Sequence, residues 1–318
     1  MKHYLAITGG VGGAKLCLGL AHALPPERVA FVANTGDDFE HLGLSICPDI
    51  DTLTYTLAGV VNTETGWGRA RETWSFMASL SALGGETWFN LGDSDLALHA
   101  LRTARLARGE RLTAITADLA RALGVRHRIL PMTDDRVRTR VLTAHGELDF
   151  QHYFVRDRCA PTVTGFLFAG AAEARVPREL DAALANPDLA GVIVCPSNPF
   201  VSIGPVLATA ELRERLGKLE VPIVAVSPIV AGLAIKGPTA KMMAELGMPT
   251  TALEVARHYR DQQGDLLDGF ILDATDSALA RDVEALGLPT VCTQTVMLTL
   301  ADRIALAERA IEFIDQLA

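Results

Sequence analysis

A glycine-rich segment near the N-terminus has the composition of a phosphate-binding turn. It reads Gly9-Gly10-Val11-Gly12-Gly13 and follows a short apolar run. Phosphate oxygens bind well to bare backbone N–H groups at the start of a helix, and glycine permits the tight turn and the close approach. The segment lacks the GxxxxGK[ST] pattern of a P-loop, and Lys15 stands where a dinucleotide-binding motif has its third glycine. The alternative is a tight strand-to-helix connection without a ligand.

Four aspartates within fifteen residues form a second candidate site, shortly after Asn34 and Thr35; they are Asp37, Asp38, Asp49 and Asp51. Carboxylates crowded in this way repel one another unless a cation or solvent separates them. Mg²⁺ prefers oxygen ligands and commonly uses one or two carboxylates together with substrate phosphates. The sequence therefore predicts a magnesium site. The alternative is a set of solvated turn acids, with Asp51 capping a helix that begins at Thr52.

Three further polar segments are candidates for substrate contacts: Gly92-Asp93, the loop that carries Ser197, Asn198 and Ser202, and Lys236. The loop follows a presumed central strand, and its side chains can hydrogen-bond a phosphate or a ring edge. The alternatives are a helix cap at Gly92-Asp93, a rigid proline-rich turn in the loop, and a surface lysine.

Short apolar runs predict the elements that position these residues. A strand, a glycine turn, a helix (Ala14–Leu24) and a second strand read as a βαβ unit, and hence as part of a parallel sheet. In such sheets ligands bind beyond the carboxyl ends of the strands. The amphipathic stretch from Leu300 to Leu317 predicts a closing helix. The expected strands are Tyr4–Thr8, Val29–Ala33, Gly191–Cys195, Pro222–Val226, Phe270–Leu272 and Thr290–Cys292.

Residues 66–124 have a different pattern, with few strand-forming residues, and predict a small helical insert. The remaining segments, 1–65 and 125–318, would then form the α/β core. Within the insert we expect helices over Trp67–Leu83, Asp95–Arg108 and Leu112–Leu123. After it, Val137–Leu142 and Glu147–Tyr153 predict a hairpin.

The composition limits the class of protein. The chain has 318 residues, 49% of them hydrophobic, and a net charge of −9, which disfavours nucleic acid as a partner. Its five cysteines include no CxxC pair, as expected of reduced thiols in the cytoplasm. No apolar stretch is long enough for a membrane helix, and no zinc or GxSxG motif is present.

Taken together and in order, these motifs resemble the CofD family, the 2-phospho-L-lactate transferases of coenzyme F-420 biosynthesis, whose actinobacterial members are called FbiA. The resemblance implies a Rossmann-like sheet with a small helical insert, a cytoplasmic homodimer and a requirement for Mg²⁺. It also implies a donor in which guanosine is joined through a diphosphate to a three-carbon acid. The terminal ribityl hydroxyl of the deazaflavin Fo attacks the phosphorus that bears the acid, and GMP leaves.

The resemblance also suggests roles for the candidate residues. Asp37, Asp49 and Asp51 would bind the metal directly or through water, and Asp38 would orient the attacking hydroxyl. The turn from Gly9 to Gly13 would hold phosphate or pack against the deazaflavin. The donor would be bound by Ser197 and Asn198, and Lys236 would offset phosphate charge.

One position departs from the family pattern. This chain has His152 after Gln151, where many relatives carry an acidic residue. The identity of the transferred acid therefore stays open among phospholactate, phosphoenolpyruvate and phosphoglycerate.

Two other functions compete with the transferase. YvcK-like proteins, which resemble nucleotide-sugar-binding regulators, share the glycine turn and the paired aspartates. In those proteins a serine- and glycine-rich segment follows the paired aspartates. This chain instead continues with Phe39-Glu40-His41 and then Pro48-Asp49-Ile50-Asp51-Thr52, which favours the transferase. A nicotinamide oxidoreductase is disfavoured by the missing third glycine and by Asn34 at the end of the second strand.

Overall fold

The computed structural model describes residues 1–235 and 237–318, and seven parallel strands form its central sheet. These strands are β1 (His3–Thr8), β2 (Val29–Ala33), β5 (Arg128–Pro131), β9 (Leu189–Val194), β10 (Ile223–Val226), β13 (Gly269–Asp273) and β14 (Thr290–Thr293). Their order across the sheet is β14-β13-β10-β9-β1-β2-β5. The predicted Rossmann-like α/β fold is thus confirmed, and each predicted central strand is present within two residues of its expected bounds.

The strands are apolar along their whole length because helices cover both faces of the sheet. In β1, Leu5 and Ile7 belong to one hydrophobic cluster, whereas Tyr4 and Ala6 belong to the other. This alternation follows from the two-residue period of a strand. The cluster containing Tyr4 is completed by helices α1 (Gly10–Ala23), α2 (Pro48–Leu57), α5 (Leu112–Ala122) and α12 (Leu300–Leu317).

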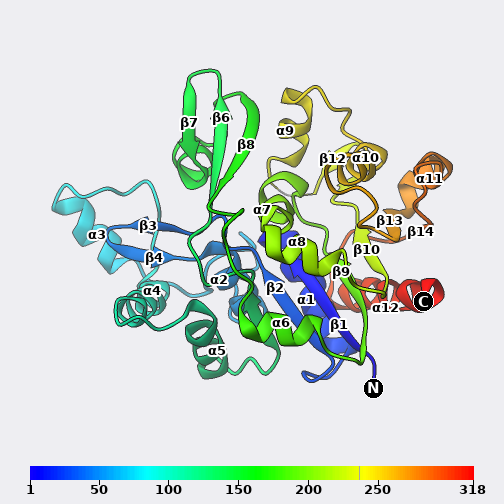
Figure 1. Ribbon diagram of the computed structural model, residues 1–318. Helices are drawn as coiled ribbons and strands as arrows, with labels where there is room; N and C mark the ends of the chain where they lie inside the picture. The colour runs from blue at the N-terminus through cyan, green and yellow to red at the C-terminus, as the bar shows by residue number, and fades with distance from the viewer. Residues whose placement is uncertain (236) are drawn as a thin grey trace.

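The opposite face is covered by a second set of helices, which can be followed in Figure 1. They are α6 (Arg178–Leu184), α7 (Gly204–Ala208), α8 (Ala210–Leu216), α9 (Thr239–Glu245), α10 (Ala252–Gln263) and α11 (Ala280–Glu284). The connections include a 3-10 turn over Ala274–Leu279 and a small pair of strands, β11 (Ile229–Val230) and β12 (Leu233–Ala234). No helix in the described ranges is both long enough and apolar enough to cross a membrane.

Residues 66–124 contain α3 (Ser75–Ala82), α4 (Asp93–Leu106) and α5. The helix predicted from Trp67 begins only at Ser75, because Arg69 forms a β-bridge with Val61 and Gly68 has a positive φ of 68°. A hairpin that the sequence analysis did not predict, β3 (Phe39–His41) and β4 (Leu44–Ile46), contacts α4. In Figure 1, α3, β3 and β4 extend together from one side of the central sheet.

A three-stranded antiparallel sheet stands apart from the central one, at the top of Figure 1. It contains β6 (Arg138–Thr143), β7 (Gly146–Asp149) and β8 (Val163–Ala169). The predicted hairpin corresponds to β6 and β7, but its second strand ends at Asp149. A short π-helix over His152–Arg156 then leads towards β8.

Candidate active site

The strand order places the candidate residues at a switch point of the sheet. The chain passes from β1 to β2 on one side, whereas β9 pairs with β1 on the other side. The loops that follow β1 and β9 therefore leave the carboxyl edge of the sheet next to each other. In open α/β sheets this is where a crevice for ligands forms.

The glycines after β1 allow these two loops to approach closely. A Cβ atom on Gly12 would lie 2.3 Å from the carbonyl oxygen of Pro196, and one on Gly13 would lie 2.1 Å from Thr8 Oγ1. The hydroxyl of Ser197 donates to the carbonyl of Gly9 at 2.7 Å and joins the loops directly. Part of the glycine pattern is therefore explained by packing within the protein.

The side chain of Asp49, a residue of α2, places its carboxylate at the N-terminus of α1. The Gly10 N–H donates to Asp49 Oδ1 at 2.7 Å, and Asn34 Nδ2 donates to Asp49 Oδ2 at 2.9 Å. The positive end of the helix dipole favours a carboxylate at this position. Gly9 also directs its N–H to the protein, towards Ser197 Oγ at 3.4 Å. Two N–H groups predicted to face a phosphate thus have partners inside the protein, and Asn34 orients Asp49.

Asp37 and Asp49 are buried together in the wall of the cavity described below. Burial raises the pKa of Asp37 well above its usual range, and the negative charge of Asp49 raises it further, although the nearby polar side chains of Thr139 and Asn34 oppose this. Burial also raises the pKa of Asp49 to about 6, although the hydrogen bonds from Asn34 and Gly10 oppose this. Asp37 Oδ1 has no hydrogen-bond partner among the described residues. Two buried carboxylates and an unpartnered oxygen are a suitable environment for a hard cation.

Asp38 and Thr35 do not occupy the positions expected of substrate-binding residues. Both are buried, and neither is among the described residues that line the cavity. The Asp38 N–H donates to the Thr35 carbonyl at 3.2 Å, within the turn that carries Asp37. Burial raises the pKa of Asp38 to about 7, against the opposing charge of Arg138. This position is inconsistent with Asp38 touching the attacking hydroxyl.

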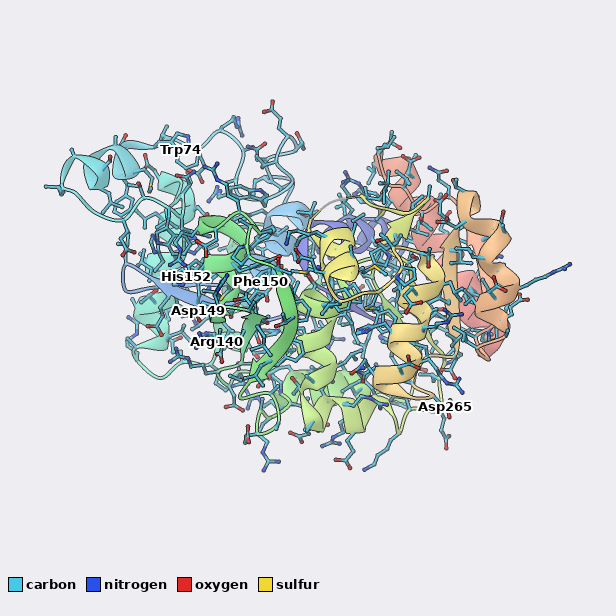
Figure 2. The ribbon with its side chains drawn as sticks, turned by 90° about the horizontal axis from the view of Figure 1, so that it is seen from above. Trp74, Arg140, Asp149, Phe150, His152 and Asp265 are labelled. Carbon is cyan, nitrogen blue, oxygen red and sulfur yellow. The ribbon has the colours of Figure 1, made fainter. Side chains whose placement is uncertain are left out.

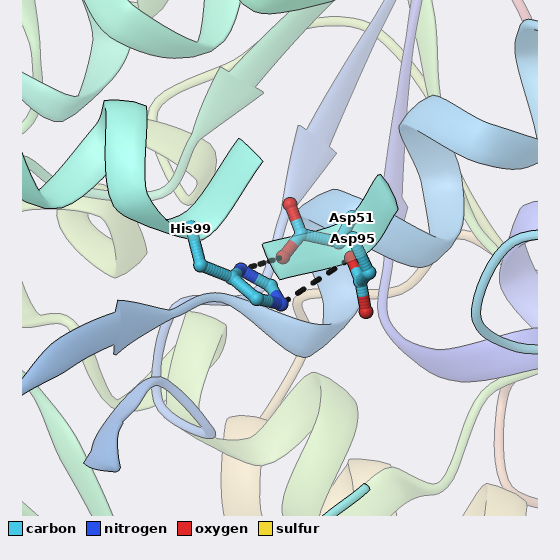
Figure 3. A group of neighbouring side chains, drawn as sticks. All are labelled: Asp51, Asp95 and His99. Carbon is cyan, nitrogen blue, oxygen red and sulfur yellow. Dashed lines mark ion pairs between the residues drawn. The ribbon is translucent and has the colours of Figure 1, made fainter. Parts of the chain in front are cut away.

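Asp51 forms a buried ion pair, in contrast to its predicted role as a metal ligand. The Arg102 guanidinium contacts both oxygens of Asp51, with Nη1 at 3.1 Å from Oδ2, and Arg102 is only 1% exposed. His99 lies between two carboxylates, with Nδ1 at 3.6 Å from Asp51 and Nε2 at 3.3 Å from Asp95 (Figure 3). The Tyr55 hydroxyl donates to Asp95. Arg102 thus neutralises Asp51, while Asp51, Asp95 and His99 also offer three ligand atoms that lie within 4.8 Å of one another.

Gly92 and Asp93 have structural roles. Gly92 is the N-cap of α4, whereas the Asp93 carboxylate accepts hydrogen bonds at the start of α3 from Thr73 Oγ1 at 2.6 Å and the Phe76 N–H at 3.0 Å. These bonds lower the pKa of Asp93. Asp95, two residues later, is the acid of this segment that lines the cavity.

The loop after β9 lines the cavity as predicted, and it is also rigid. Asn198 Oδ1 accepts the Phe200 N–H at 2.9 Å and caps a π-helix over Pro199–Ile203. Ser197, Asn198 and Ser202 are all part of the cavity wall. Lys236 lies outside the described residues.

The cavity has a volume of about 660 Å³, within the range of ligand-binding pockets. Its wall includes the glycine turn, α2, the insert, the connection between β7 and β8, and the loops after β9, β10 and β14. Several residues of the wall were not among the predicted site residues, because the surrounding sequence assigns them no role in binding. These include three aromatic residues of the insert and two basic residues: Trp67, Trp88, Phe89, Lys15 and Arg158.

His152 lies between the small antiparallel sheet and the insert. Its ring centroid is 4.9 Å from that of Trp88 in an edge-to-face contact, and its Nδ1 lies 3.6 Å from Asp149 Oδ2. Asp149 also pairs with Arg140, and Figure 2 shows these side chains near Phe150. His152 therefore supports an aromatic residue of the cavity wall.

Comparison with known proteins relates this geometry to a family. The family model described as 2-phospho-L-lactate transferase CofD matches residues 5–301. A protein of Streptomyces griseus subsp. griseus named phosphoenolpyruvate transferase is 38% identical over 317 residues, covering 98% of each chain. A protein of the same name from Streptomyces coelicolor is 39% identical over 313 residues, covering 97% of this chain and 96% of the other.

A solved structure supports the fold alone. A member of the UPF0052 family from Bacillus halodurans has a TM-score of 0.64 and 13% sequence identity. The match covers 98% of this chain and 99% of that protein.

Proposed function

The chain belongs to the CofD family of 2-phospho-L-lactate transferases, and from this premise we propose that it transfers a phosphorylated three-carbon acid in coenzyme F-420 biosynthesis. The donor is the acid joined through a diphosphate to guanosine, and the acceptor is the ribityl hydroxyl of Fo. The hydroxyl oxygen forms a bond to the acid-bearing phosphorus, the bond from that phosphorus to the bridging oxygen breaks, and GMP leaves. The observation that carries the proposal is full-length similarity to named transferases, together with a cavity that contains Asp37 and Asp49.

Among the candidate acids we favour phosphoenolpyruvate, because the similar Streptomyces proteins carry that name. Phospholactate and phosphoglycerate are the two other acids to be tested. The nucleotide-sugar-binding regulator is not favoured, since the sequence similarity is to transferases over nearly the whole chain. We further propose that the protein acts in the cytoplasm as a homodimer, as its family resemblance implies.

The proposed cofactor is Mg²⁺, held by Asp37 and Asp49. The two carboxylates are buried side by side in the cavity wall, and the unpartnered Asp37 Oδ1 is available as a ligand atom. When bound, the ion would neutralise charge on the diphosphate oxygens. Gly10 and Asn34 hold Asp49 in place through its two oxygens. The proposed metal site does not include Asp51, because the carboxylate of Asp51 is already paired with the guanidinium of Arg102.

The remaining substrate contacts follow from the cavity wall. Transfer at phosphorus depends mainly on positioning and on neutralisation of charge. Ser197, Asn198 and Ser202, held in the loop after β9, would position the donor. Trp67 and Trp88 offer flat aromatic surfaces for the ring systems of the substrates.

The reaction can be tested directly with purified protein, Fo and Mg²⁺. Three reactions would each contain one guanosine diphosphate-linked acid, and mass spectrometry would identify the products. We expect GMP and a product whose mass equals Fo plus the phosphorylated acid minus one water, formed fastest from the phosphoenolpyruvate donor. Absence of product with all three donors would rule out the proposed function.

The raised pKa of Asp49 predicts an unusual pH dependence of stability. Because the folded pKa of about 6 exceeds the ordinary 3.8, the folded protein binds more protons between these values. The metal-free protein should therefore lose roughly 2–3 kcal/mol of unfolding free energy, through this group, as the pH rises from 4 to 7. Mg²⁺ should restore this unfolding free energy at pH 7. Below about pH 6 it should stabilise the protein only weakly, because protons compete with the ion for the carboxylates.

The measurement is calorimetric unfolding across this pH range, with and without Mg²⁺, for the wild type and for Asp49→Asn. The variant lacks the titrating carboxylate and keeps an oxygen that can accept the Gly10 N–H. Superimposable pH profiles for the two proteins would show that Asp49 does not titrate as described.

A further inference from the structure

Arg158 is a cationic residue of the cavity wall, and none of the described residues pairs with its side chain. It lies in the connection from the π-helix to β8, and its side chain makes no hydrogen bond or ion pair with any residue in the described ranges. The neighbouring acid, Asp157, is paired with Arg156 at 2.9 Å. Lys15, the other basic residue described in the wall, donates to the carbonyl of Met297 at 3.1 Å. Arg158 therefore offers a guanidinium to a ligand.

The backbone at Arg158 adopts a conformation that favours glycine. The φ angles of Arg158 and Cys159 are 50° and 57°, in the left-handed region that is costly for residues with a Cβ atom. The turn is fixed by hydrogen bonds from the Cys159 N–H to the Tyr153 carbonyl at 2.8 Å and from the Ala160 N–H to the Asp157 carbonyl at 2.9 Å. Strained residues of this kind are concentrated at ligand-binding sites. The fold thus tolerates an arginine where glycine would be more stable.

The charges around the cavity indicate what Arg158 would bind. Four carboxylates line the same wall, at Asp37, Asp49, Asp51 and Asp95. A donor with a diphosphate and a carboxylate is itself strongly anionic, so a fixed cation in the wall offsets repulsion. A guanidinium forms paired hydrogen bonds with either a carboxylate or a phosphate, which suits it to the acid end of such a molecule.

We propose that Arg158 binds an anionic group of the donor, either the carboxylate of the three-carbon acid or a phosphate oxygen. This assignment rests on the proposed function and makes Arg158 a residue that determines affinity for the donor. Among the five described non-glycine residues with a positive φ, Arg158 is the one that lines the cavity, so the strained turn places its side chain at the site.

The test uses Arg158→Gly, in which stability and function should change in opposite directions. Glycine removes the strain, so the melting temperature should rise. Loss of the guanidinium should raise the KM for the donor about 10- to 100-fold, the range expected for a lost charged hydrogen bond, and leave the KM for Fo unchanged. Arg158→Gln, which keeps the left-handed strain, should show the same KM effect without the gain in stability.

Arg71→Gly is the matched control. Arg71 is exposed, has a φ of 57°, and lies outside the described wall of the cavity. Its variant should gain stability with unchanged kinetic constants. Inhibition by GDP, which carries the diphosphate but no acid, separates the two anionic groups: a raised inhibition constant in Arg158→Gly indicates phosphate, and an unchanged one indicates the carboxylate.

Wild-type turnover reports on the proposed function, whereas the variants report on Arg158. If the wild type transfers the acid and both Arg158 variants keep its donor KM, the inference is overturned and the proposed function stands. If the wild type transfers no acid, the proposed function fails, and with it the assignment of Arg158 to this donor.

Discussion

An Asp37→Asn variant is expected to fold normally and to lose about 100- to 1000-fold in kcat, a range typical for removal of one group that stabilises charge during a reaction. Asp37 is buried in the cavity wall beside Asp49, and its Oδ1 has no partner among the described residues. The amide keeps the size of the side chain but removes the negative charge that would hold Mg²⁺. The same change removes an unfavourable buried charge, so the metal-free variant should be at least as stable as the wild type.

Steady-state kinetics over a range of Mg²⁺ concentrations would measure this effect, alongside a thermal unfolding curve. Asp265→Asn is the control, because Asp265 is an exposed surface acid with its side chain 87% accessible (Figure 2). Its kinetics should be those of the wild type. If Asp37→Asn retained full turnover and the same Mg²⁺ dependence, Asp37 would have no part in metal binding.

Arg102→Met should be the most destabilising of the substitutions considered, with a loss of about 3–5 kcal/mol in the free energy of unfolding. Arg102 is almost fully buried and pairs with Asp51, while its Nη1 also donates to the Ser45 carbonyl at 3.2 Å. Methionine fills much of the same volume but leaves Asp51 as a buried charge near Asp95. The pair connects α4 of the insert to α2, the helix that carries Asp49.

Denaturant unfolding of single and double variants would distinguish the energy of the Arg102–Asp51 interaction from the effect of changing each residue alone. Replacing both partners, as Asp51→Leu with Arg102→Met, removes the uncompensated charge and should recover most of the lost stability. Arg108→Met is the control, since Arg108 is exposed on the surface and pairs with Glu110. A double variant as unstable as Arg102→Met alone would show that the uncompensated charge on Asp51 is not the cause.

The sheet and its switch point were predictable because their signals are local. The apolar runs, the glycine turn after β1 and the proline-rich loop after β9 each follow from a few adjacent residues. The parallel order then brings the carboxyl ends of β1 and β9 together without further information. Asp37 and Asp49 were identified because both belong to a short acid-rich stretch of sequence, Asp37 in the loop after β2 and Asp49 in the first turn of α2.

The roles of Asp51 and the insert were not predictable, because their partners are distant in sequence. From the sequence, Asp51 resembles a third metal ligand. In the structure it is paired with Arg102, which is 51 residues away in the sequence. Asp93 resembles a site residue more than Asp95 does, yet Asp93 caps a helix that starts upstream, at Ser75. The left-handed backbone at Arg158 has no signature in the sequence, because a non-glycine residue gives no indication of a positive φ.

The position of a bound metal tests the central claim most directly. Crystals grown with Mn²⁺ in place of Mg²⁺, and with GDP, would locate the ion through its anomalous scattering. We expect one strong peak coordinated by the carboxylates of Asp37 and Asp49, beside the glycine turn. A peak only among Asp51, Asp95 and His99, whose ligand atoms lie within 4.8 Å of one another, or no peak at all, would contradict the proposed active site.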